Sequence, residues 1–475
     1  MNKSLIKYML IAGLAMPLTS CSDFLNEQPH DQISAAAFYQ SPKEIQLATN
    51  AIYDALQAQV QTEFAITEMR TDNSKARNGE GSWAEFQRLI INPNNNIVAQ
   101  YWKNSYAAIF RANTVLANLG NAYQLENGKY NGTGAQYEGE ALFVRALMHF
   151  KLVRLFGQVP MSSDVATAGQ TEKFKQVNPQ DVYAMIISDL EKAVEDLPVQ
   201  SATQYGRATK GAAQALLAKV YLTQKEYTKA LPLLKSVIDS GEYKLQSDFH
   251  DIFYNEGNDE VMFAIQYIEG NKAESQQFSD YFHYANGAGG LNYATKDLQA
   301  SWEVNDKRKD VTQVEDPKNV ENDQSPCYQP GKYLNIDPTS NDVKTSGNDW
   351  IEMRYADVLL MYAEAQAAGS ATTDGEALKY FNEVRDRAGL PAATEITQAS
   401  LLNERRHEFA MEDQRLFDLQ RFGKWTEVME KFQGSLMTPA QPKADLPEGS
   451  DLLPIPQREI NTTNGILVQN PGYRS

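Results

Sequence analysis

The chain has 475 residues, with 44 basic and 61 acidic side chains and a formal net charge of −17. Nucleic acid is excluded as an expected partner, because its recognition depends on a surplus of lysine and arginine. The length exceeds one ordinary core, so we expect two domains or an extended repeat scaffold with an insertion, and the sequence favours the second.

The N-terminus reads as a lipoprotein signal. Lys3 and Lys7 form a basic region, residues 8–16 are apolar, and residues 18–21 read Leu-Thr-Ser-Cys. The apolar run is shorter than the roughly twenty residues that span a bilayer. We therefore expect residues 1–20 to be removed, Cys21 to carry lipid at a membrane surface, and residues 21–32 to form a tether. The alternative is an ordinary secretory signal with a chance cysteine. Cys327 then stands alone, so no intramolecular disulfide is expected.

Helical periodicity dominates the next part of the chain. Residues 101–119 and 138–156 have the spacing of amphipathic helices, and Pro179 and Pro198 bracket another helix. Residues 207–240 read as a helical hairpin with tetratricopeptide spacing, and residues 350–390 read as a second copy. Such units bury their apolar faces only by stacking on neighbours. The prediction is a mostly α fold with a tetratricopeptide-like scaffold at 33–249 and 350–433.

The composition changes at about residue 250. Residues 250–349 are rich in Gly, Asn, Asp, Pro and Tyr, with short strands expected at 261–267 and 333–336. A loop-rich segment of this length in a compact protein is usually functional or disordered, and the aromatic content argues against disorder. A second irregular stretch covers 434–475. We expect 250–349 and 434–475 to pack together as a ligand-binding lobe.

The sequence contains no motif for catalysis. His407-Glu408 lacks a histidine at position 411, which is Met411, so no zinc-protease helix forms. The glycines of 287–290 lack the spacing of a dinucleotide loop. A glycosidase carboxylate pair is defined by separation in space, which counting carboxylates does not give. We expect no catalytic residue, no metal and no cofactor.

A series of short motifs, in a fixed order, runs along nearly the whole chain. They include Cys21-Ser-Asp-Phe-Leu, Glu138-Gly-Glu-Ala-Leu, Leu155-Phe-Gly-Gln-Val-Pro, Arg354-Tyr-Ala-Asp-Val-Leu, Glu404-Arg-Arg-His-Glu-Phe and Gln469-Asn-Pro-Gly-Tyr. In this the chain resembles the SusD/RagB family of outer-membrane nutrient-binding lipoproteins of Bacteroidota. The resemblance implies a tetratricopeptide-like scaffold with an irregular binding lobe. It also implies a protein that caps a TonB-dependent transporter and delivers oligosaccharides, or in some branches peptides, to it.

The charged motifs have a structural interpretation. Glu404, Arg405, Arg406 and Glu408 alternate in sign along one helix, so solvated or interhelical ion pairs are expected. Asp306-Lys-Arg308 similarly reads as a cluster at a helix end.

Sugar binding requires flat aromatic rings beside hydroxyl-binding polar groups. The loop at 70–83 contains both, and by position the resemblance makes Asp72, Asn73, Arg77 and Trp83 candidates. Packing of Trp83 under its own loop is the alternative. Residues 278–302 are the second such stretch, in which Tyr281 and Tyr284 could present adjacent rings. Trp302 is a further candidate, for which a packing role competes. These three complete the candidate set.

The expected function is capture of an oligosaccharide at the cell surface for a partner transporter, with the protein acting as a lid. A peptide-binding lid of the RagB type is the near alternative. A helical-repeat adaptor without a small ligand is the distant one. Convergence of Trp83, Tyr281 and Tyr284 on one exposed cleft would favour the glycan, and their separate burial would favour the adaptor.

Overall fold

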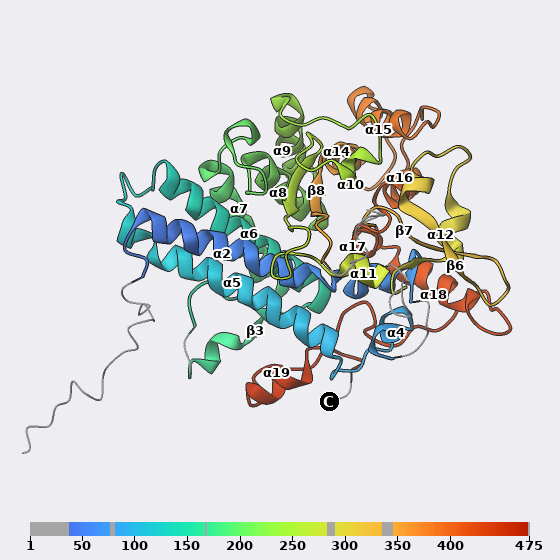
Figure 1. The fold of residues 1–475 in the computed structure, drawn as a ribbon, viewed down its shortest axis with the longest axis horizontal. Helices are drawn as coiled ribbons and strands as arrows, with labels where there is room; N and C mark the ends of the chain where they lie inside the picture. Colours follow the sequence, from blue (N-terminus) through green and yellow to red (C-terminus); the bar gives the residue numbers. More distant parts are fainter. Residues whose placement is uncertain (1–37, 77–80, 167–168, 283–289, 335–344, 474–475) are drawn as a thin grey trace, which may run out of the picture.

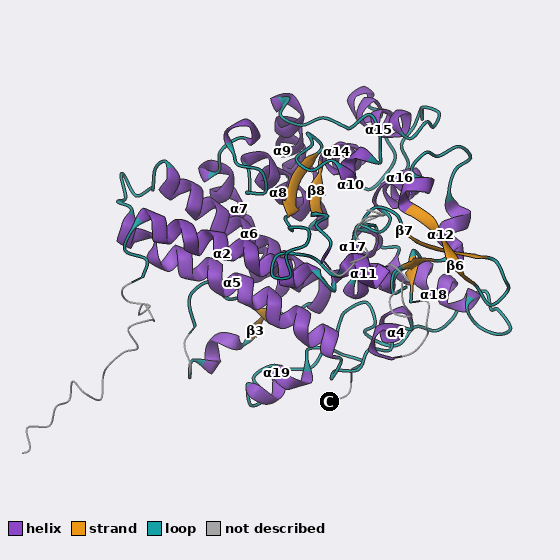
Figure 2. Ribbon diagram, viewed as in Figure 1, coloured by secondary structure: helices purple, strands orange, loops and turns teal. Residues whose placement is uncertain are grey.

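The computed structural model describes residues 38–76, 81–166, 169–282, 290–334 and 345–473. Helices make up most of this part of the chain, and its strands are short and form two-stranded sheets (Figure 2). The predicted mostly α fold class is confirmed. Cys21, Arg77 and Tyr284 lie outside the described residues.

A stack of long helices forms the scaffold. Each helix packs on the one before it, and α9 packs directly on α14 although a long insertion separates them in sequence (Figure 1). The stack consists of α2 (Pro42–Val60), α5 (Asn96–Ala122), α6 (Thr133–Phe156), α7 (Pro179–Asp196), α8 (Lys210–Thr223), α9 (Tyr227–Ser240), α14 (Tyr355–Ala367) and α15 (Gly375–Arg387). The helices expected at 101–119, 138–156, 179–198 and 207–240 are all present.

The hairpin of α8 and α9 shows why these residues pack closely. Thr209 caps α8 by accepting a hydrogen bond from the Ala212 amide at 3.1 Å. A Cβ on Gly211 would lie 2.5 Å from the hydroxyl oxygen of Tyr243, so only glycine fits there. Gly241 ends α9 with φ +67°, a left-handed conformation that glycine adopts without strain.

The insertion between α9 and α14 is built from short elements. They are α10 (Asp251–Tyr254), β4 (Val261–Ile265), α11 (Phe278–Phe282), β5 (Tyr293–Ala294), α12 (Lys296–Ser301), α13 (Lys309–Thr312), β6 (Gln313–Val320), β7 (Pro326–Pro330) and β8 (Trp350–Arg354). β4 pairs antiparallel with β8, so the insertion leaves and rejoins the scaffold at one place. β5 pairs with β1 (Ser74–Lys75), and β6 pairs with β7.

The strand predictions are partly wrong. The strand expected at 261–267 is confirmed as β4. Tyr333 and Leu334 are not in a strand, and the rest of the stretch predicted at 333–336 lies outside the described residues. Residues 350–354 were expected to open a helix but form β8, because β4 supplies the pairing partner for their backbone.

The C-terminal part packs mainly on the scaffold rather than on the insertion. After α16 (Gln398–Phe409), α17 (Arg415–Arg421) and α18 (Trp425–Ser435), the chain runs irregularly to α19 (Gln457–Thr462). The Leu453 amide donates to the Leu155 carbonyl at 2.8 Å, and the Asn470 side chain donates to the Phe156 carbonyl at 2.9 Å. The joint lobe of 250–349 and 434–475 stays a prediction, and the hydrogen bonds named here join the second segment to the scaffold. Phe432, Ser435 and Leu436 face the insertion across a hollow described below.

A buried ion-pair network joins the insertion to the scaffold. Arg354, at the end of β8, pairs with Glu260 at 2.9 Å and with Glu412 at 2.8 Å. Arg308 pairs with Glu404 at 2.6 Å and with Glu408 at 3.0 Å. These side chains are almost fully buried, so the ion pairs expected at the Glu404 motif are interhelical and not solvated. Asp306 and Arg308 lie at the start of α13, as expected for a cluster at a helix end, and their ion pair is part of the same interior network.

Candidate ligand-binding site

Two aromatic side chains from distant parts of the sequence meet at the junction of scaffold and insertion. Trp83 lies on α4 (Gly81–Gln87) and Tyr281 on α11, and their ring centroids are 5.4 Å apart at an interplanar angle of 51°. Both side chains are half-buried. The two short helices that carry them lie near each other in Figure 1. Tilted, partly exposed rings of this kind can hold the apolar face of a sugar.

Phe64 supports this aromatic pair from below. It lies on α3 (Glu63–Ile66), is 1% exposed and stacks on Trp83 with centroids 5.5 Å apart and planes 10° apart. Its centroid is 6.1 Å from that of Tyr281, and Phe282 meets it edge-on at 5.0 Å. The pair is thus one side of a larger aromatic cluster. Sequence reasoning missed Phe64, although its place in the short apolar run after α2 was a signal for a buried ring.

Hydrogen bonds fix the helix that carries Trp83. The Asn95 side chain, which also caps α5, donates to the Ser82 carbonyl at 3.0 Å and to the Glu85 carboxylate at 2.8 Å. The Asn92 amide donates to the same carboxylate at 2.9 Å. These bonds tie α4 to the start of the long helix α5.

The helix that carries Tyr281 is tied down at both ends. The Gln277 amide donates to the Gln61 side chain at 2.8 Å, and the Leu291 amide donates to the Tyr281 carbonyl at 3.0 Å. Burial and the neighbouring Asp280 carboxyl raise the pKa of Tyr281. Its hydroxyl therefore stays protonated at neutral pH and can donate a hydrogen bond to a ligand.

Asp72 and Asn73 point inward, so their predicted contact with ligand is not supported by their placement. Arg415 binds both carboxylate oxygens of Asp72, at 2.9 and 2.8 Å, and Arg406 lies 3.1 Å away. Burial opposes ionisation of Asp72, but the two guanidinium groups outweigh it and lower its pKa to about 2. Asn73 donates to Glu68 at 2.9 Å and accepts from Arg406 at 2.8 Å. Both residues position the start of the 70–83 loop.

Trp302 has a packing role. Its indole stacks on His407, with centroids 4.7 Å apart, and its Nε1 donates to the Gln313 side chain at 3.1 Å. It packs on a small apolar cluster that includes Leu298 and Met411. Among the described residues, the ring that Trp302 contacts is therefore that of His407, and not Trp83 or Tyr281. Burial lowers the pKa of His407 to about 4, so the stacked imidazole is neutral at physiological pH.

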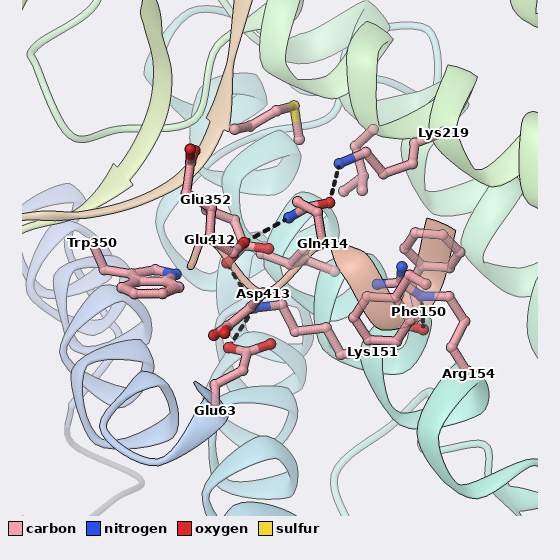
Figure 3. Close-up of a pocket in the computed structure, with 14 residues that line it drawn as sticks. Glu63, Phe150, Lys151, Arg154, Lys219, Trp350, Glu352, Glu412, Asp413 and Gln414 are labelled. Atoms are coloured by element: carbon pink, nitrogen blue, oxygen red, sulfur yellow. Dashed lines mark hydrogen bonds and ion pairs between the residues drawn. The ribbon is translucent and has the colours of Figure 1, made fainter. Parts of the chain in front are cut away.

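A polar cavity inside the scaffold is a second candidate for a ligand-binding site (Figure 3). Its centre is Lys151, which bridges Glu63 at 2.8 Å and Glu352 at 2.6 Å. The free volume is only ≈ 20 Å³, room for about one water molecule. This cavity is too small and too enclosed for a nutrient. Its charged side chains form ion pairs with one another inside the protein.

Asp413 is an unusual member of that cavity. Its carboxylate lies beside that of Glu63 in Figure 3, and neither of its oxygens has a hydrogen-bond partner among the described residues. Burial and the carboxylates of Glu63 and Glu68 raise its pKa well above the ordinary range. These surroundings favour the protonated, uncharged form of the side chain.

The described residues contain no group of three or more His, Cys, Asp or Glu side chains that could hold a metal ion. Within the same residues, no helix has both the length and the apolar character needed to cross a membrane.

Comparisons with known proteins agree with this architecture. A family model described as "SusD family" matches residues 240–473, and one described as "Starch-binding associating with outer membrane" matches residues 23–222. SusD-like protein P2 of Formosa agariphila is 29% identical over 97% of this chain and 98% of its own length. Starch-binding protein SusD of Bacteroides thetaiotaomicron is 25% identical over 70% of this chain and 72% of its own.

Solved structures have the same fold. A laminarin-binding SusD-like protein superposes with a TM-score of 0.76 and 25% identity, covering 92% of this chain and all (100%) of its own. Surface glycan-binding protein A of Bacteroides thetaiotaomicron gives a TM-score of 0.76 at 23% identity, over 91% of this chain and 100% of its own. The two family models together cover most of the sequence, and the chain belongs to the SusD/RagB family of outer-membrane-associated proteins.

Proposed function

We propose that this protein binds an oligosaccharide on the aromatic pair of Trp83 and Tyr281. The observation that carries the proposal is the meeting of these two half-buried rings over Phe64, from segments far apart in sequence. Such rings present flat apolar faces to the C–H face of a sugar. Starch binding by one relative and laminarin binding by another, as their names state, support a neutral glycan as the ligand class.

The protein delivers this glycan to a TonB-dependent outer-membrane transporter. The lipid on Cys21 holds it at the membrane, and the tether of residues 21–32 lets it swing as a lid. Family membership supports this role. Capture close to the transporter raises the local concentration of a ligand that would otherwise diffuse away.

Calorimetric titration of the purified protein with laminarin, starch and their oligosaccharides, and with a peptide digest, tests the binding proposal. We expect heat from a glycan, and Trp83→Ala to weaken its binding by about fivefold or more, because one aromatic contact contributes roughly 1 kcal/mol or more. Phe110→Ala is the matched control, because Phe110 is an exposed ring (49%) on α5 outside the aromatic pair.

The melting temperature of each variant separates lost binding from lost folding. Heat only from peptides would overturn the glycan proposal in favour of a peptide-binding lid. Glycan binding that Trp83→Ala leaves intact would move the site away from the aromatic pair.

A further inference from the structure

A hollow of ≈ 580 Å³ lies at the end of α4, the helix that carries Trp83, between the insertion and the C-terminal helix α18. Its volume is within the range of roughly 300–1,000 Å³ that small-molecule sites occupy. Strand β1, helices α4, α12 and α18 and the turn between β6 and β7 form its walls. The side chains that matter here are Lys75, Gln87, Glu321, Asn322, Phe432 and Leu436.

The hollow is built on the elements that also carry the aromatic pair. Gln87 follows Trp83 by four residues on α4, so the two side chains lie on one face of the helix about 6 Å apart along its axis. On the other side, the Tyr281 carbonyl accepts from Leu291, just before β5. β5 pairs with β1, which contributes Lys75 to the hollow. A chain molecule held by the rings therefore has this hollow as its next neighbour.

The walls offer hydrogen-bonding groups suited to sugar hydroxyls. The side-chain amides of Gln87 and Asn322 make no hydrogen bond with the described part of the chain, and each can donate and accept. Lys75 and Glu321 form an ion pair at 2.5 Å, with 19% and 15% of their side chains exposed. A hydroxyl at this pair can accept from the ammonium group and donate to the carboxylate. Phe432 and Leu436 supply apolar surface nearby.

The charge balance of the hollow selects against anions. Asp297, Glu321 and Asp323 face two lysines, Lys75 and Lys296. Lys296 is already paired with Asp323, and Asp297 is paired with Arg406 at 2.7 Å. Among the described lining residues, both lysines already have a carboxylate partner, so a carboxylate or sulfate on the ligand would meet no unpaired cation there and would be repelled by the carboxylates.

We propose that this hollow is a second subsite, which holds the sugar units that extend beyond the aromatic pair, and that it accepts neutral and not anionic sugars. The proposal rests on glycan binding at Trp83 and Tyr281. It adds a specificity for chain length and charge that the rings alone do not give.

The test is the dependence of affinity on oligosaccharide length. Laminari- and malto-oligosaccharides of increasing length are titrated into the wild-type protein and into the double variant Gln87→Ala/Asn322→Ala. We expect wild-type affinity to rise with length, and the double variant to lose about tenfold for the longest chains and progressively less for shorter ones. This corresponds to roughly two hydrogen bonds. A sulfated or carboxylated analogue of the same length binds more weakly than the neutral chain.

The control is Asn121→Ala, an exposed amide at the far end of α5, which should not change the length dependence. An unchanged length dependence in the double variant overturns the subsite, while a loss in Trp83→Ala at every length still supports the aromatic site. Anionic chains that bind as tightly as neutral ones overturn the charge selectivity. If no member of either series binds the wild-type protein, the subsite falls together with the proposed function.

Discussion

Asp349 is a buried carboxyl at the point where the insertion returns to the scaffold. It accepts hydrogen bonds from the Tyr267 amide and the Tyr205 hydroxyl, both at 2.9 Å. Burial, together with the Glu256 carboxyl, raises its pKa to about 7, in spite of these two donors. The folded protein therefore holds this proton far more tightly than the unfolded chain, in which the pKa is about 3.8.

The pH dependence of stability follows from this shift. The stabilisation from the proton on Asp349 is fully present below about pH 4 and is lost as the pH rises through 7. Asp349→Asn should therefore unfold at higher urea than wild type at pH 8. The difference, on the order of 4 kcal/mol at most, should vanish near pH 4. The amide can still accept from Tyr267 and can donate to the Tyr205 oxygen.

Urea titrations at both pH values measure this difference. Asp259→Asn is the matched control, because Asp259 is an exposed carboxyl (54%) near the start of β4, and its small stability difference from wild type should be the same at the two pH values. A stability difference for Asp349→Asn of equal size at pH 4 and pH 8 would show that ionisation of this carboxyl is not its cause.

Residue type and local composition pointed to the two rings that the structure brings together, but not to the direction of the polar side chains. Trp83 and Tyr281 could be selected from sequence because each is an aromatic residue in a stretch rich in polar groups, and their contact with a ligand stays a prediction. The direction of Asp72 could not, because the guanidinium group that turns it inward belongs to Arg415, 343 residues later. A loop carboxylate with no basic residue nearby in the sequence suggests a ligand contact. Only the fold shows that its partner is a basic residue from a distant part of the chain.

At the scale of elements, Glu408 on α16 joins three parts of the fold. Its carboxylate pairs with Arg308 before α13, with Arg354 at the end of β8 and with Arg387 on α15. Burial opposes its ionisation, but the three guanidinium groups outweigh this and hold its pKa well below the usual range. One acidic side chain therefore fixes the relative positions of insertion and scaffold.

Removing this carboxylate should be costly. Glu408→Ala leaves buried arginines without part of their counter-charge, and we expect a loss of roughly 3–5 kcal/mol in the free energy of unfolding. Urea denaturation measures this loss, and Glu408→Gln serves if the alanine variant does not fold. Glu427→Ala, which breaks the exposed pair with Lys424, should cost no more than about 1 kcal/mol. Equal losses in both variants would contradict a structural role for the network.

Some elements can be predicted from the local sequence pattern, whereas others form only because a distant strand pairs with them. The helical hairpin of α8 and α9 follows from periodicity and its glycine end signal, both of which are local. β8 does not, because Trp350 to Arg354 form a strand only by pairing with β4, which lies on the other side of the insertion. The sequence could not decide whether the charged side chains of α16 are solvated or form interhelical ion pairs, because their buried partners come from other elements.

At the scale of the whole molecule, the proposed binding site lies where scaffold and insertion meet. Phe64 belongs to the segment that follows the first scaffold helix, whereas Tyr281 belongs to the insertion. One hydrophobic core runs through both parts. The aromatic pair is therefore held by the packing of the entire fold, so a movement of the insertion relative to the scaffold would separate its two rings.

Attachment to the membrane should depend on Cys21 alone. The signal before it predicts lipidation, and the net charge of −17 disfavours adsorption to anionic lipid. Acyl chains supply about 0.8 kcal/mol for each buried methylene. We expect Cys21→Ala to abolish incorporation of labelled palmitate and to move the protein into the soluble fraction, with glycan affinity retained. Cys327→Ala, at the other cysteine, should stay with the membrane. A Cys21→Ala protein that still sediments with membranes after a high-salt wash would contradict the lipid anchor.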